Sequence, residues 1–186
     1  MRQSISNAQL AKGKKTDNVF LAPKRSGFSA IKKRKEEKNM KHFVCRTCNF
    51  VSLEGKIERC PVCGQSSFDE IENAYKTPDF KAATGESEKK HIPVLSVKHK
   101  DVGISAKVKF GEIIHPMMAE HHIEYADFYV NNKYVSRIKF SPAVLPIAKI
   151  YVDAKTEGKI EVIGFCNLHG LWFNETQISK KEVING

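Results

Sequence analysis

The sequence predicts a mainly β protein, in which an antiparallel β-sandwich follows a small metal-binding knuckle and a disordered basic tail. Three observations predict it. Short segments rich in β-branched residues recur from residue 91 onward, separated by turn residues. Four of the five cysteines form two CxxC pairs within residues 45–63. Nearly all of the net charge of +10 lies in the first 41 residues.

The tail, residues 1–40, is polar and lysine-rich and has no apolar period, a composition typical of disordered chains. Residues 1–41 contain twelve Lys/Arg against three Asp/Glu, whereas residues 42–186 contain nineteen against eighteen. Because the remainder is nearly neutral, the charge does not favour a nucleic-acid-binding face on a folded domain. A solvated extension, an organelle-targeting presequence and a nucleic-acid-binding arm stay open as interpretations of the tail.

The location of the protein is predicted from two absences in the sequence. No apolar run reaches the roughly 18 residues that a membrane helix needs, and no signal-peptide pattern is present. In such a chain, CxxC pairs favour metal binding over disulfides. We therefore expect a cytoplasmic protein without a membrane partner.

The knuckle, residues 41–75, places eleven residues between its two cysteine pairs. Each CxxC lets two thiolates face one ion, and two such turns complete a tetrahedron of Cys45, Cys48, Cys60 and Cys63. Zinc and iron both accept this set. The segment resembles the rubredoxin-like module of the rubrerythrins, flanked by Phe43, Phe50 and Phe68. This resemblance favours iron over zinc, although Asn49 stands where that module usually has glycine.

Residues 76–90 contain proline, glycine and small polar residues without a strand or helix pattern, which indicates a linker. Residues 91–186 then carry about seven strand-like segments, the number and size of an immunoglobulin-like sandwich. The pair Asn131-Asn132 suits a two-residue hairpin turn. The strand-like segments are 91–97, 104–110, 122–130, 133–140, 148–154, 159–167 and 171–176.

One cysteine stands outside the knuckle. Cys166 is followed three positions later by His169 in "CNLHG", and "HPMMAEHH" separates His115 from His121 by six positions. His91 begins the first predicted strand, after two lysines. A lone thiol suits a buried structural position, but beside these histidines it also suits a second metal site. We expect His42, His99 and His122 to be ordinary surface histidines.

Three ordered segments, "KHIPV", "HPMMAEH" and "CNLHGLW", are similar to the signature segments of the superoxide reductases, the desulfoferrodoxin and neelaredoxin group. The resemblance spans roughly residues 88–175. It implies an immunoglobulin-like β-sandwich that carries one non-haem iron and reduces superoxide to hydrogen peroxide. Carried across by position, it implies four imidazole ligands and one axial thiolate on that iron. These ligands would be His91, His115, His121, His169 and Cys166.

The same resemblance assigns two residues beside the ligands. Lys90 matches a lysine that attracts superoxide and orients a proton-donating water. The family's glutamate, which caps the oxidised iron, falls on Lys89, so that Glu88 is left as the possible sixth ligand. The expected partners are superoxide, a rubredoxin-like or other one-electron donor, and further copies of the chain in a homo-oligomer. A non-enzymatic iron electron carrier and a zinc-ribbon nucleic-acid-binding protein stay open as alternative functions.

Overall fold

The computed structural model describes residues 41–78 and 86–178, and the side chains of residues 86–88 are outside this description. The described residues all belong to one compact unit. The predicted disordered tail, residues 1–40, lies outside the described residues, as does part of the predicted linker. No helix among the described residues is long and apolar enough to cross a membrane.

The knuckle is a three-stranded antiparallel sheet with two turns. Its strands are β1 (Lys41–Cys45), β2 (Val51–Ser52) and β3 (Phe68–Glu72), in the order β2-β1-β3. Asn49 and Gly64 each follow a cysteine pair and adopt the left-handed backbone, with φ of 55° and 77°. This conformation turns the chain tightly after each pair, which Asn and Gly tolerate best.

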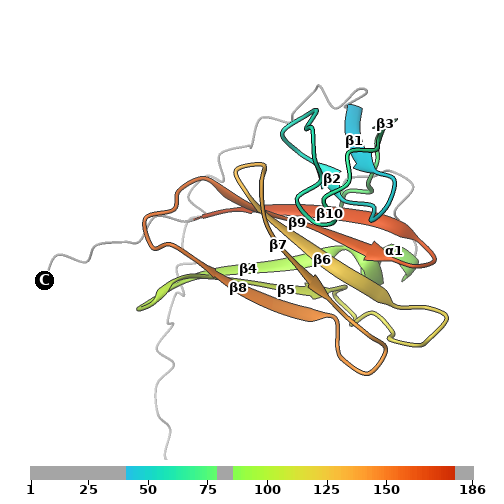
Figure 1. Ribbon diagram of the computed structural model, residues 1–186. Helices are drawn as coiled ribbons and strands as arrows, with labels where there is room; N and C mark the ends of the chain where they lie inside the picture. The colour runs from blue at the N-terminus through green and yellow to red at the C-terminus, as the bar shows by residue number, and fades with distance from the viewer. Residues whose placement is uncertain (1–40, 79–85, 179–186) are drawn as a thin grey trace, which may run out of the picture. The chain divides into compact units, whose positions relative to one another are not determined.

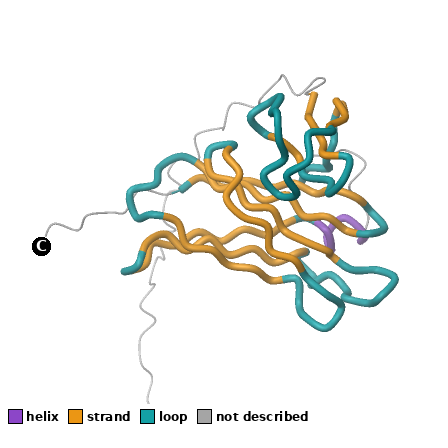
Figure 2. Tube along the Cα trace, in the orientation of Figure 1, coloured by secondary structure: helices purple, strands orange, loops and turns teal. Residues whose placement is uncertain are grey.

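The second half of the chain is a two-layered sandwich (Figures 1 and 2). One sheet has the order β10-β9-β6-β7 and the other β4-β5-β8, and every pairing is antiparallel. A short helix, α1 (Glu86–His91), precedes the first strand of the sandwich. The strands are β4 (Pro93–Lys100), β5 (Gly103–Phe110), β6 (Ile123–Val130), β7 (Lys133–Lys139), β8 (Ile147–Val152), β9 (Lys159–Cys166) and β10 (Gly170–Gln177).

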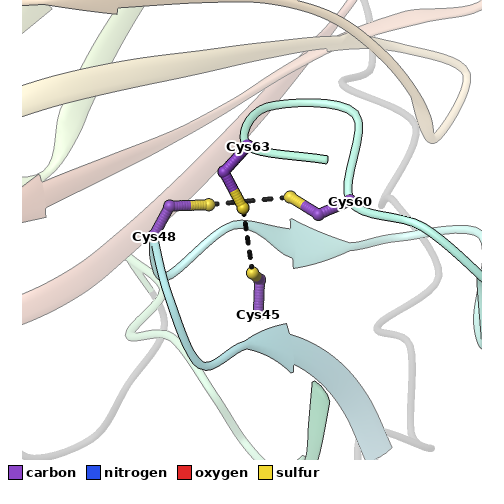
Figure 3. Close-up of side chains that lie close together, drawn as sticks. All are labelled: Cys45, Cys48, Cys60 and Cys63. Atoms are coloured by element: carbon purple, nitrogen blue, oxygen red, sulfur yellow. Dashed lines mark hydrogen bonds between the residues drawn. The ribbon is translucent and has the colours of Figure 1, made fainter. Parts of the chain in front are cut away.

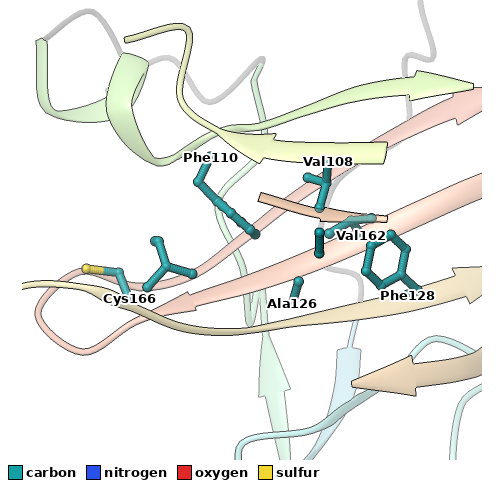
Figure 4. Packing of buried hydrophobic residues seen from close by; sticks show 8 residues of the cluster. Val108, Phe110, Ala126, Phe128, Val162 and Cys166 are labelled. Atoms are coloured by element: carbon teal, nitrogen blue, oxygen red, sulfur yellow. The ribbon is translucent and has the colours of Figure 1, made fainter. Parts of the chain in front are cut away.

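The main hydrophobic core lies between the two sheets. Val108 and Phe110 from β5 meet Ala126 and Phe128 from β6, all fully buried (Figure 4). Cys166, at the end of β9, belongs to the same cluster. The core therefore extends to the end of the sandwich at which the lone cysteine lies.

Alternate residues of β6 and β9 point away from this core, toward the knuckle. Tyr129 and Ile163 pack with Val44 and Phe50 in a second buried cluster. Three side chains of the sandwich also donate hydrogen bonds to knuckle carbonyls: Tyr125 to Asn49 at 3.0 Å, Tyr129 to Val51 at 2.8 Å and Arg137 to Cys48 at 2.8 Å. Strands β6 and β9 are thus buried on both faces.

The mainly β fold class is confirmed, and each predicted strand segment overlaps an observed strand. Asn131 and Asn132 form the predicted hairpin turn with φ of 51° and 69°. Two expectations were wrong. The segment expected to be featureless contains α1. His42 is not a surface histidine, because it is 4% exposed and its ring packs on Tyr75 with centroids 4.6 Å apart. The domain boundaries stay a prediction.

Candidate metal centres

The four knuckle cysteines converge, as the CxxC spacing predicts. Their sulfur atoms lie within 4.8 Å of one another, and all four thiols are free. Cys45 and Cys63 are 3.5 Å apart and Cys48 and Cys60 are 3.6 Å apart (Figure 3). Four sulfurs bound tetrahedrally at about 2.3 Å would be about 3.8 Å apart. The observed separations therefore fit one tetrahedral ion.

Backbone amides point at three of these sulfurs and favour their thiolate form. The amide of Gln65 is the main cause that lowers the pKa of Cys63 to about 7. Burial raises the pKa of Cys48 and Cys60, while amides of the turns oppose that rise. Because these thiols lie so close together, the loss of a proton from one of them changes the pKa of its neighbours. An ion bound there would be held by thiolates that the amides of the turns help to stabilise.

The second group of ligands comes from four parts of the sandwich. His91 ends α1, His115 and His121 lie in the loop between β5 and β6, Cys166 ends β9, and His169 lies in the turn before β10. The ligand atoms of His91, His115, His121 and Cys166 lie within 4.8 Å of one another. His169 joins them through its Nδ1 atom, 3.5 Å from the sulfur of Cys166.

The four imidazole rings form a closed cycle. Ring centroids of neighbouring pairs are 4.4 Å apart for His91–His115, 4.6 Å for His115–His121, 4.8 Å for His121–His169 and 4.5 Å for His169–His91. The diagonal pair His91–His121 is farther apart, at 5.6 Å. Such a square brings four imidazole rings together around one point.

Distances between ligand atoms agree with a single ion at that point. The Nε2 atoms of His91 and His115 are 2.9 Å apart, and nitrogens bound at right angles at about 2.1 Å would be about 3.0 Å apart. The sulfur of Cys166 lies 3.7 Å from Nε2 of His115. The sulfur thus supplies a fifth donor next to the four nitrogens.

Hydrogen bonds and burial keep His115 in the form that binds metals. Its Nδ1–H donates to the carbonyl of Pro116 at 2.6 Å, which leaves the lone pair on Nε2, the atom that faces the other ligands. His115 is 1% exposed, and burial lowers its pKa to about 4. Burial also lowers the pKa of His169. Neutral imidazole is therefore favoured at both positions.

Cys166 is buried, and burial raises the pKa of its thiol. The amides of Leu168 and His169 point at the sulfur and oppose this rise. A bound cation would act in the same direction, because metal binding deprotonates a coordinating thiol. The turn between β9 and β10 therefore holds the donor set of a thiolate and an imidazole on one short loop.

Asn167 joins the two ligand loops. Its side-chain amide donates to the carbonyl of Glu120 at 3.0 Å, and its carbonyl oxygen accepts the N–H of His122 at 2.9 Å. Met118 and His121 form a two-way backbone bridge at 3.0 Å and 3.1 Å, which orients the imidazole of His121. No signal in the sequence singles out Asn167, because its role depends on a loop more than forty positions away.

The two residues predicted beside the ligands lie in α1. Lys90 is half-buried and immediately precedes His91. Gly111, with φ of 84°, lets the β5–β6 loop pass close to the end of α1; a Cβ there would lie 2.7 Å from Cα of Lys90. Glu88 lies in α1, but its side chain is outside the described part of the chain, so its role as sixth ligand stays a prediction.

Comparisons with known proteins agree with this site. The desulfoferrodoxin family model matches residues 83–175, a range that contains all five ligand candidates of the sandwich and none of the knuckle cysteines. A superoxide reductase from Pyrococcus abyssi is 30% identical over 119 residues, 58% of this chain and 98% of that protein. One from Pyrococcus furiosus is 33% identical over 109 residues, 48% of this chain and 88% of that protein.

Among solved structures, the superoxide reductase (neelaredoxin) from Ignicoccus hospitalis is 28% identical, with a TM-score of 0.47, over 57% of this chain and 95% of that one. The family match covers half of the chain and includes Cys166 and the four histidines whose rings surround the site. This chain belongs to the desulfoferrodoxin family.

Proposed function

We propose that the protein is a superoxide reductase, which reduces superoxide to hydrogen peroxide with one electron and two protons. The observation that carries the proposal is the square of four imidazoles with the sulfur of Cys166 beside it. Five protein donors leave one position of an octahedral ion for a small ligand. The superoxide reductases among the matched relatives support the same activity.

Iron bound by these five residues would supply the electron that superoxide accepts. The four neutral imidazoles would leave the positive charge of the ion uncompensated, so the site attracts an anion. Cys166 would provide the only negative charge among the ligands and would donate electron density to the ion. This donation favours release of the reduced product once it has been protonated.

Lys90 is the proposed catalytic residue outside the ligand set. Its position next to His91 at the end of α1 places a flexible ammonium close to the ligands. The ammonium would attract superoxide and orient the water that delivers protons. Lys89, which is exposed, adds a second positive charge to the same turn of α1.

The metal of the knuckle and the electron donor belong to the same proposal. We propose iron in the four-cysteine site, with zinc as the alternative that the tetrahedral sulfur geometry equally accepts. A rubredoxin-like or other one-electron donor would re-reduce the sandwich iron, and the chain would act as a homo-oligomer in the cytoplasm. We do not propose that the knuckle takes the place of this donor through its contacts with the sandwich.

The decisive experiment adds superoxide to the reduced protein and counts hydrogen peroxide. A reductase yields one peroxide for each electron that the protein loses, whereas disproportionation yields peroxide without oxidising the protein. An electron carrier with a closed second site yields no peroxide above the uncatalysed background. Metal analysis of the same sample, with its visible spectrum, would identify the metal at each site. Absence of oxidation linked to peroxide would refute the reductase proposal.

A further inference from the structure

Lys76 lies against the loop that carries Cys166 and His169, although the sequence predicts a linker at this position. Its backbone pairs with β10: its N–H donates to the carbonyl of Leu171 at 3.0 Å, and its carbonyl accepts the N–H of Phe173 at 2.8 Å. Any residue except proline makes both bonds equally well. The backbone pairing therefore fixes the position of residue 76 but does not require its side chain to be a lysine.

The ammonium of Lys76 makes two contacts beside the metal centre. Its Nζ donates to the carbonyl of His169 at 3.3 Å. It also lies 4.7 Å from the centre of the Trp172 ring, within the range of a cation–π contact. Trp172 is 2% exposed, and its ring stacks on His91 with centroids 4.9 Å apart. The ammonium of Lys76 thus contacts His169 directly, and it reaches His91 through the ring of Trp172.

A half-buried charge at this position acts strongly on its surroundings. Lys76 is only partly exposed, so solvent screens its field less than that of an exposed lysine. A fixed positive charge near the ligands stabilises the thiolate of Cys166. It also opposes any further gain of positive charge at the site, such as the oxidation of a bound ion. Its hydrogen bond holds the peptide that follows His169 in place.

We propose that Lys76 is a positioning residue of the metal centre, whose ammonium orients the Cys166–His169 loop and biases bound iron toward its reduced state. The proposal deepens the proposed function and rests on it for the presence of iron. The proposed mechanism uses Lys90 as its nearby cation, whereas Lys76 comes from a different segment and acts through the ligands. For the reductase, such a bias keeps the electron available at the site between encounters with superoxide.

Three substitutions separate the charge from the rest of the side chain. Lys76→Met keeps an unbranched stem and both backbone bonds and removes the charge. Lys76→Gln also removes the charge but keeps a hydrogen-bond donor, and it serves if the methionine variant folds poorly. Lys76→Arg keeps the charge. Lys149→Met is a matched control, because its Nζ lies 5.4 Å from the ring of Tyr151 on β8, in the other sheet.

Two measurements on the full-length protein report on these variants. The first is the midpoint potential of the sandwich iron, followed by its absorbance during a redox titration. The second is the fluorescence of Trp172, the single tryptophan of the chain, recorded without metal. The fluorescence tests the contact between Lys76 and Trp172 whether or not iron binds.

We expect the Met and Gln variants to have a lower midpoint potential at unchanged iron content, and a shifted Trp172 emission. Lys76→Arg should restore both values toward the wild type, and Lys149→Met should change neither. Wild-type potential and emission in both neutral variants would overturn the proposal, as would an arginine variant that behaves like methionine. A wild-type protein without a thiolate-to-iron absorption would instead reject the proposed function, and the metal-free emission would still decide whether Lys76 acts on Trp172.

Discussion

The Nδ1 atom of His115 donates a hydrogen bond of 2.6 Å to the carbonyl of Pro116, the next residue in the chain. The bond turns the Nε2 atom toward His91 and Cys166, so that a local contact prepares a ligand for partners far away in the sequence. Pro116 cannot donate a backbone hydrogen bond and its φ is fixed, which limits how the loop can relax. Burial then keeps the imidazole neutral.

The stability of the metal-free protein should fall on acidification because of His115. Its pKa is about 4 in the folded chain and 6.5 ordinarily, so the unfolded chain binds the proton more tightly. The free energy of unfolding is unaffected by this group above its ordinary pKa and decreases as the pH falls toward about 4. By about pH 4.5 the free energy of unfolding should have fallen by about 2.5 kcal/mol through this one group.

Urea unfolding at about pH 7.5 and at about pH 4.5 measures this decrease. His115→Gln should lose less stability over the same interval, and an equal loss in both proteins would contradict the assignment.

Cys166→Ser should remove the thiolate-to-iron absorption of the oxidised sandwich site, because serine supplies no thiolate. The spectrum of the knuckle should be unchanged, since its four sulfurs lie in a separate cluster. Cys63→Ser is the reciprocal control, which should alter the knuckle spectrum and spare the other. An unchanged absorption in Cys166→Ser would show that the sulfur is not a ligand.

Lys90→Ala should slow the capture of superoxide without loss of iron. Steering by one ammonium should contribute roughly tenfold or less at low salt, and the difference should shrink as salt screens the charge. Pulse radiolysis at several ionic strengths measures the capture rate. Lys133→Ala, at an exposed position in the β6–β7 hairpin, is the control and should match the wild type. Identical rates for Lys90→Ala and the wild type at every salt concentration would remove Lys90 from the mechanism.

Arg137→Met should destabilise the protein by about 3–5 kcal/mol, because it leaves the charge of Asp127 buried without a partner. The guanidinium binds both carboxylate oxygens of Asp127 at 2.6 Å, and the two side chains are 6% and 0% exposed. It also donates to the carbonyl of Cys48 and lies 3.5 Å from the ring centre of Tyr125. Urea unfolding measures the loss.

Two further variants test the cause of that loss. Arg46→Met removes a solvent-exposed ion pair with Asp69 and should leave the free energy of unfolding almost unchanged. The double variant Arg137→Met with Asp127→Leu removes both buried charges and should recover most of the stability. A double variant no more stable than Arg137→Met would show that the unpaired carboxylate is not the cause.

Much of the fold could be predicted because its signals are local. β-Branched segments, CxxC turns and the Asn131-Asn132 pair each act within a few residues, and the observed strands and turns follow them. The short helix α1 was missed, since six residues carry too little periodicity to be recognised. The buried position of His42 was missed for another reason: its partner Tyr75 is 33 residues away.

The sequence by itself determined which residues could serve as ligands, because thiol and imidazole chemistry and the spacing within each motif are properties of short segments. Only the tertiary structure decided that the four imidazoles and Cys166 meet at one place, which requires the sandwich to bring α1, two loops and the end of β9 together. It also decided the contacts of Lys76, Asn167 and Arg137. Their contacts join residues far apart in the chain, and the burial that strengthens those contacts exists only once the sheets have packed.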